Sequence, residues 1–359
     1  MNWKRITPVI VSGLYFLVSG IYTPAQKSEW HSDLTAAMAA HQRGEYSVAQ
    51  NLYTQTLEIQ EKALGPDSVE VAVTLNNFAV LYEDQHLYAH AEPLFKRSLA
   101  IWEKHPGREA EAVSALNNLA DLYHDEDMDA SAEPLYTREL AILQKTGKSG
   151  SADAALATGR LADIVHAQGN ESGAEALYIR AVAIWEQSGK TPGFEAVNAF
   201  YRLGDIYHSR SKNTEAEPLY VQALAIWENA GSMESSPAIA TLDNLADIYR
   251  SEGEYAKAEP LLIKVLAIRE HKLGPDHLDV AASVSKLALF YNCEGQYDAA
   301  EPLYKRAVEI REKNLGPKDP AVLQTMEFYA ALLRQEGRKR DAQNIEAQVR
   351  GAATANLNF

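Results

Sequence analysis

A five-residue phrase returns along this chain at a nearly constant interval, and no other feature of the sequence constrains the fold so strongly. In its commonest form the phrase reads Ala-Glu-Pro-Leu-Tyr, as at residues 216–220. From Leu135 to Leu303 its leucine recurs every 42 residues, and related phrases at 49–53 and 342–345 extend the series in both directions. A fixed period of this size predicts a solenoid of about eight units, in which each unit buries its apolar face by stacking on its neighbours.

Each unit contains two helical patterns. The first has apolar residues at helical spacing, as in Leu75, Phe78 and Tyr82. The second carries a proline close to its first turn, where the missing amide hydrogen costs little. Breakers such as the Gly-Pro pair at 274–275 separate the units, and no strand pattern competes. We therefore predict an all-α fold in which residues 28–350 form antiparallel helix pairs.

Small residues recur at two phases of the period, one in each helix of the pair. At such positions the backbones of packed helices come closest, and a larger side chain overpacks the contact. We therefore expect both rows to be buried. The row of the first helices is Ala79, Ala120, Ala162, Gly204, Ala246, Ala288 and Ala330, and the row of the second helices is Ala49, Ala91, Ala132, Ala174, Ala216, Ala258, Ala300 and Ala342.

These rows, with an aromatic residue before the turn, resemble the tetratricopeptide repeat (TPR), and the phrases at 116–123, 273–281 and 301–307 resemble its kinesin-light-chain variety. The resemblance covers nearly all of the chain after residue 30. It implies a right-handed superhelix whose concave groove is lined by the first helix of each pair and holds a peptide segment of a partner protein. The first unit departs from the pattern: its first helix keeps Ala37 but lacks large apolar residues, which is typical of a terminal cap.

The face of the first helices that avoids the small-residue row is polar. Stepping along it by the repeat gives three columns, spaced three residues apart and hence on one side of the helix. We interpret these columns as the binding surface for the partner segment. The candidate residues are Asn77, Asn118, Arg160, Arg202, Asn244 and Lys286 in the first column, Asp121, Asp163, Asp205 and Asp247 in the second, and His124, His166 and His208 in the third.

Asparagine suits such a surface because its amide offers a donor and an acceptor to an extended peptide backbone. The TPR resemblance implies this role for Asn77, Asn118 and Asn244. The basic members of the first column suit an acidic ligand segment, and the aspartates suit a basic one. Alternatively, Arg160 with Asp163, and the matching pair in the next unit, neutralise each other on a solvated face, since such i,i+3 pairs contribute only ~0.2–0.5 kcal/mol.

The histidine column raises the question of a metal site. Ligands must converge to about 2.0–2.2 Å from one ion, whereas neighbouring units lie roughly a helix diameter apart, ~10 Å. We therefore predict neither a metal nor a cofactor. Protonation of the three histidines in an acidic groove as the pH falls toward 6 is an alternative role for this column.

Charge and cysteine content narrow the function. The chain has 34 Lys and Arg against 49 Asp and Glu, a net charge of −15 that argues against nucleic-acid binding. Its single cysteine, Cys293, excludes an internal disulfide. The sequence favours a non-catalytic scaffold for protein–protein interaction, with its oligomeric state open. The alternatives are a metal-dependent hydrolase built on the Asp and His columns, or a self-assembling structural array.

The N-terminus has the pattern of an export signal. A basic start precedes the uncharged apolar stretch 6–20, and Thr23 and Ala25 offer the small residues that a signal peptidase recognises. We therefore predict a signal peptide at 1–25, cleavage near Ala25, and a periplasmic or secreted mature chain. Because the apolar stretch is shorter than the ~20 residues that span a bilayer comfortably, an uncleaved membrane anchor is the second hypothesis. We expect a polar tail at 351–359.

Overall fold

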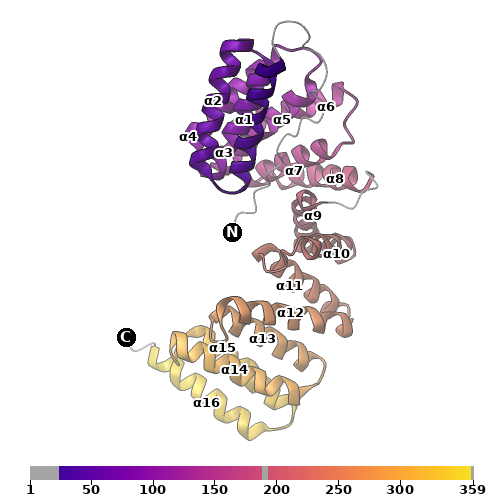
Figure 1. Cartoon of the computed structure of the whole chain (residues 1–359). Coiled ribbons are helices and arrows are strands. Elements are labelled where there is room, and N and C mark those ends of the chain that lie inside the picture. Colours follow the sequence, from indigo (N-terminus) through magenta and orange to yellow (C-terminus); the bar gives the residue numbers. More distant parts are fainter. Residues whose placement is uncertain (1–23, 188–192, 357–359) are drawn as a thin grey trace. The chain divides into compact units, whose positions relative to one another are not determined.

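The computed structural model describes residues 24–187 and 193–356, and both ranges are almost entirely helical. The chain divides into two compact units, Met1–Lys190 and Thr191–Phe359, which we describe separately (Figure 1). Sixteen α-helices and one short 3-10 helix occur in the described ranges.

Eight of these helices belong to the first unit. They are α1 (Pro24–Gln42), α2 (Tyr46–Leu64), α3 (Val69–Asp84), α4 (Tyr88–Glu103), α5 (Glu109–Asp125), α6 (Asp129–Lys145), α7 (Ala152–Ala167) and α8 (Glu171–Gln187). The second unit starts with the 3-10 helix η1. Its elements are η1 (Phe194–Ala196), α9 (Val197–Ser209), α10 (Asn213–Asn229), α11 (Ser236–Ser251), α12 (Tyr255–Leu273), α13 (Leu278–Cys293), α14 (Tyr297–Leu315), α15 (Pro320–Gln335) and α16 (Lys339–Asn356).

The helices pack as consecutive pairs. Each odd-numbered helix makes its largest contact with the even-numbered helix that follows it, and within each unit every pair then packs on the next (Figure 1). One pair therefore corresponds to one period of the sequence, with an odd-numbered first helix and an even-numbered second helix. The predicted all-α fold of about eight stacked helix pairs is confirmed.

The breaker between two pairs acts through backbone conformation. Gly274 ends α12 with φ of 87°, a region that a residue with a side chain adopts only at a cost. Its amide still donates to the carbonyl of Glu270 at 3.0 Å, so the last turn of the helix is closed. Pro275 then follows and cannot continue the helix, and the chain turns back into α13.

Both rows of small residues are buried, as predicted. Gly204 shows how tight the packing is in the row of the first helices. A Cβ atom on Gly204 would lie 2.7 Å from Cε1 of Tyr220 in the paired helix α10, closer than real Cβ contacts come. The glycine that interrupts this row of alanines is therefore required by the position of the Tyr220 ring.

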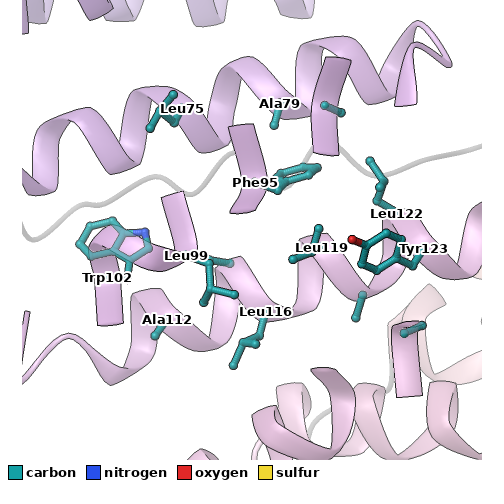
Figure 2. Packing of buried hydrophobic residues seen from close by; sticks show 14 of the residues in the cluster. Leu75, Ala79, Phe95, Leu99, Trp102, Ala112, Leu116, Leu119, Leu122 and Tyr123 are labelled. Atoms are coloured by element: carbon teal, nitrogen blue, oxygen red, sulfur yellow. The ribbon is translucent and has the colours of Figure 1, made fainter. Parts of the chain in front are cut away.

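The large apolar side chains fill the space on either side of these rows. In the first unit one cluster joins the five consecutive helices α3 to α7, with aromatic Phe95 between aliphatic residues of its neighbours (Figure 2). Full burial of each such side chain contributes about 1.5–3 kcal/mol relative to exposure. Members of this cluster are Leu75 and Ala79 of α3, Phe95 and Leu99 of α4, and Leu116 and Leu119 of α5.

The ends of the described chain bear on two predictions from the sequence. The predicted signal peptide lies outside the described residues, apart from the first two residues of α1, Pro24 and Ala25. At the other end α16 continues to Asn356, so the first part of the expected polar tail is helical. Among the residues that the structure describes, no helix is both long and apolar enough to cross a membrane.

Candidate functional site

Polar residues of successive first helices contact one another within each unit. We use the term inner face for the side of these helices that carries the three predicted columns. Contacts across it join α3 to α5 and α5 to α7 in the first unit, and α9 to α11 and α11 to α13 in the second. The predicted columns therefore lie along a shared face in each unit.

The contact between α3 and α5 is a pair of asparagines. Asn118 donates from Nδ2 to Oδ1 of Asn76 at 2.9 Å. Asn77 is only 5% exposed. The Nδ2 atoms of Asn76 and Asn77 are buried without a hydrogen-bond partner among the described residues, whereas the amide of Asn117 faces the buried carboxyl of Glu139. This end of the inner face therefore holds two amide donors that the chain itself does not satisfy.

The aspartate column is occupied by donors from the core. In three successive pairs the hydroxyl of a tyrosine in the second helix donates to the aspartate 15 residues earlier in the first helix. The distances are 2.5 Å for Tyr136 to Asp121, 2.5 Å for Tyr178 to Asp163, and 2.7 Å for Tyr220 to Asp205. Burial and the carboxylate raise the pKa of Tyr136 well above its usual value, so this phenol stays protonated as a donor.

Two of the three charged members of the first column, Arg160 and Lys286, reach back to the preceding helix pair. Arg160 lies 3.3 Å from Asp121, measured from Nε to Oδ1, and this carboxylate is the main reason that the pKa of Arg160 is raised. The observed ion pair of Arg160 is therefore with an aspartate of the preceding helix pair. The guanidinium of Arg202 stacks over the ring of Tyr201, 5.0 Å from its centroid.

In the second unit, contacts between first-column residues and the preceding helix pair form a denser network. Asn244 donates to Oδ1 of Asp205 at 3.3 Å and to the hydroxyl of Tyr220 at 3.2 Å. Lys286 places Nζ 3.1 Å from Oδ1 of Asp243 and 2.7 Å from Oδ2 of Asp247. The basic and acidic residues of adjacent helix pairs thus neutralise one another across the inner face.

Sequence reasoning missed a fourth column, which precedes the first by one residue. It contains Asn76, Asn117 and Asp243, and the Asn-Asn doublets at 76–77 and 117–118 were its visible sign. Asp243 accepts from Arg269 of α12 at 3.0 Å as well as from Lys286. This aspartate therefore links a second helix to the inner face.

The histidines of the third column face their own helix pair. His124 lies 2.7 Å from Asp129, and His208 lies 3.2 Å from Asn213, each contact joining Nδ1 to an oxygen at the start of the second helix. Nδ1 of His166 is buried without a hydrogen-bond partner in the described part of the chain. Within the same part, no group of three or more His, Cys, Asp and Glu residues is arranged to hold a metal ion.

One buried acid lies behind the inner face of the first unit. Glu139 of α6 is fully buried, and neither carboxyl oxygen has a hydrogen-bond partner among the described residues. Burial, reinforced by Asp121 and Asp153, raises its pKa to about 9. Alanine occupies the equivalent position in other pairs, for example Ala223. The sequence analysis did not single out Glu139, although an acid in a column that otherwise holds small or apolar residues was a visible signal.

A small, shallow hollow opens next to Asn76. Helices α3, α4 and α5 all contribute to its wall. The residues that line it are Val73, Asn76, Trp102, Glu111, Ser114 and Ala115.

The protein is an α-helical repeat protein, because each period of the sequence forms one helix pair and consecutive pairs pack on one another. A family model described as tetratricopeptide repeat matches residues 31–104, 77–145, 111–187, 153–229 and 279–355, and a second model with that description matches 239–279. These matches cover most of the chain, and the chain belongs to the tetratricopeptide repeat family.

Several solved structures are similar to this chain. A putative kinesin light chain with nearly identical TPR-like repeats from Podosopora anserina is 26% identical, with 56% of this chain and 96% of that chain covered and a TM-score of 0.48. The apo form of RapI is 15% identical over 79% and 98% of the two chains, with a TM-score of 0.53. The C-terminal part of a TPR protein from Cytophaga hutchinsonii is 14% identical over 81% and 98%, with a TM-score of 0.52. The last two likenesses concern the fold alone, and no curated protein gives a match.

Proposed function

We propose that this protein is a non-catalytic scaffold that binds an extended segment of a partner protein on its inner face. The observation that carries the proposal is the pair of unpartnered amide donors on Asn76 and Asn77. A buried donor without an acceptor costs about 1–3 kcal/mol. Backbone carbonyls of an extended segment supply acceptors at regular intervals, and they do so without requiring a particular ligand sequence.

The charges of the inner face support binding rather than chemistry. Aspartates of the second column already accept hydrogen bonds from tyrosines, and Arg160 and Lys286 already pair with aspartates of the preceding helix pair. A general base or nucleophile must be able to reach a substrate, whereas these groups are engaged with one another. We therefore assign them to alignment of the helices, and assign the grip on the ligand to the asparagines.

A triple variant tests this assignment. Asn76, Asn77 and Asn118, which form the asparagine cluster between α3 and α5, are changed to alanine in the full chain, which is then used as bait beside the wild type. We expect an unchanged helical circular dichroism spectrum and loss of the captured partner. The matched control changes three exposed asparagines, Asn51, Asn229 and Asn344, to alanine. Equal recovery of the same partner by both triple variants would remove the inner face from the mechanism.

We further propose that the mature chain is exported. The support is the apolar stretch 6–20 after a basic start, together with the small residues that precede the expected cleavage near Ala25. Cleavage there leaves Trp30 in place, whose side chain is buried in α1. N-terminal sequencing of the purified protein tests the proposal. A first residue near Gln26 supports export by cleavage, and an intact N-terminus supports the membrane anchor.

A further inference from the structure

The inner face changes its chemistry between two successive repeats of the second unit. The earlier site lies on α11, α12 and α13, where Arg269 and Lys286 share the carboxylate of Asp243. One repeat later the equivalent site lies on α13, α14 and α15. There Arg269 is retained as Arg311, but Asp243, Asp247 and Lys286 are replaced by Ser285, Leu289 and Phe328. The later site thus keeps one cation and loses both carboxylates.

Arg311 has no carboxylate to replace the one that Arg269 contacts. The half-buried Arg311 donates to the hydroxyl of Thr325 and to the carbonyl of Ala321. Among the described residues no carboxylate lies within ion-pair distance of its guanidinium. Burial lowers the pKa of Arg311, and no neighbouring acid raises it again. A half-buried cation without an anion loses part of its hydration, so an external anion is favoured there.

Tyr304 gives a second, independent sign of a missing carboxylate. It is only 1% exposed, and its hydroxyl has no hydrogen-bond partner among the described residues. The equivalent hydroxyl of Tyr220 donates to Asp205, 15 residues earlier. The residue 15 positions before Tyr304 is Leu289, which cannot accept a hydrogen bond. Two donors of α14, Tyr304 and Arg311, have therefore lost the acceptors that other repeats provide.

The residues that replace the charged pair are apolar and accessible. Leu289 is 36% exposed and Phe328 is 43% exposed. They take the positions of Asp247 and Lys286, whose charged groups lie 2.7 Å apart in the earlier site. Ser285 is small, and its hydroxyl donates to the carbonyl of Ala281 in its own helix. The position of Asp243 is thus taken by a residue without a carboxylate, next to two accessible apolar side chains.

We infer that the inner face of α13 and α15 binds a partner segment that carries a carboxylate beside a bulky apolar side chain. The carboxylate accepts from Arg311, and the apolar side chain packs on Leu289 and Phe328. This inference rests on the proposed function and specifies the ligand chemistry of one part of the inner face. Charge complementarity selects this occupant. In the earlier repeat the arginine pairs with Asp243 of the chain, and in the later repeat the ligand's carboxylate takes the place of that missing acid.

The test restores the internal acid. Ser285→Asp places a carboxylate where Asp243 stands one repeat earlier, so it occupies Arg311 without removing any existing contact of the arginine. Ser285→Asn is the matched neutral control. Random 12-residue peptides displayed on phage are selected on the full wild-type chain, and an enriched peptide is synthesised with glutamate or with glutamine at its acidic position. Binding is measured by fluorescence anisotropy.

We expect enriched peptides to contain an acid next to a large apolar residue. Ser285→Asp should lower the affinity for the acidic peptide about ten-fold, and Ser285→Asn less than about two-fold, as for loss of one charge-assisted contact. The glutamine peptide should bind both variants equally weakly. Because Ser285→Asp adds an ion pair, an unchanged or raised melting temperature separates loss of binding from loss of folding.

Each other outcome counts against the inference in its own way. Enriched peptides that show no acid preference, or an acid preference that survives Ser285→Asp, overturn the inference and leave the proposed function standing. Enrichment of no peptide above background removes both. Sedimentation that shows self-association through Phe328, lost in Phe328→Asp, identifies a second copy of the chain as the occupant and also overturns it.

Discussion

The hydroxyl of Tyr220 donates to the carboxylate of Asp205 at 2.7 Å, and this bond joins the core of a helix pair to its inner face. Tyr220 is fully buried, whereas Asp205 is half-buried. Asn244 of the next pair donates to the same two groups, so one hydrogen-bonded group spans two repeats. The inner face is therefore held in position by the core rather than by a flexible set of surface side chains.

Tyr220→Phe and Tyr304→Phe form a matched pair that tests the value of this bond. Both remove one hydroxyl from a buried ring, but only Tyr220 has an acceptor for it. We expect Tyr220→Phe to lower the free energy of unfolding by about 0.5–1.5 kcal/mol. Tyr304→Phe should leave it unchanged or raise it, because an unsatisfied polar group is removed. Urea unfolding followed by circular dichroism measures both, and equal losses would contradict the assignment.

Periodicity predicted the backbone of this protein well, because a repeat that stacks on itself leaves few choices. The positions of Ala246 and its row followed from the period alone, and the structure buries all of them. Side-chain partners on the inner face were harder to predict. Arg160 was weighed as an i,i+3 partner of Asp163, yet its ion pair is with Asp121, 39 residues earlier. Which of two acids an arginine reaches depends on the helix-to-helix stacking, and this is not visible in local spacing.

The tyrosine–aspartate bonds were missed for a related reason. Tyr136 and Asp121 lie in different helices and 15 residues apart, so no helical periodicity relates them. The change from aspartate to Leu289 in the second column was visible in the sequence. Its consequence became clear only from the structure, in which Tyr304 has no acceptor for its hydroxyl and Arg311 has no carboxylate partner among the described residues.

Glu139→Gln should change the pH dependence of stability. The pKa of Glu139 is raised to about 9 in the folded chain, against an ordinary value of 4.5. The folded state therefore holds its proton more tightly than the unfolded state, and stability falls as the pH rises from about 4.5 toward 9. Glutamine keeps the shape and does not ionise. We expect the variant to be more stable than the wild type by about 2–4 kcal/mol at pH 8.

The sign of this effect is checked by the same measurement at lower pH. Near pH 5, only half a pH unit above the ordinary pKa, about a quarter of the unfolded carboxyls are still protonated, so the advantage of Glu139→Gln should shrink to less than about 1 kcal/mol. Urea unfolding at pH 5, 6.5 and 8 gives the three values. An advantage that stays constant across this range would mean that Glu139 is not the ionising group.

Ala246→Leu tests the packing between paired helices. Ala246 is 1% exposed and belongs to the row where backbones come closest. Three extra carbon atoms cannot be accommodated there without moving α12, and overpacking of this kind costs about 1–3 kcal/mol. Ala256→Leu, at an exposed position of α12, is the control and should change the unfolding free energy by less than about 0.5 kcal/mol. A melting temperature that is unchanged in Ala246→Leu would contradict the assigned contact.

Asp243→Asn should destabilise the second unit more than loss of an exposed ion pair does. Asp243 is 15% exposed and serves both Arg269 and Lys286, so its neutralisation leaves the partly buried Arg269 without an anion, while Lys286 keeps Asp247. Breaking a buried ion pair costs 3–5 kcal/mol, and partial solvent access reduces this to about 1–3 kcal/mol here. Asp276→Asn is the control, because Asp276 is 60% exposed in its pair with Lys313 and such pairs contribute about 0–1 kcal/mol. Urea unfolding at low and high salt compares the two variants. Since screening weakens exposed pairs most, the loss in Asp243→Asn should persist at high salt, while any loss in Asp276→Asn should disappear.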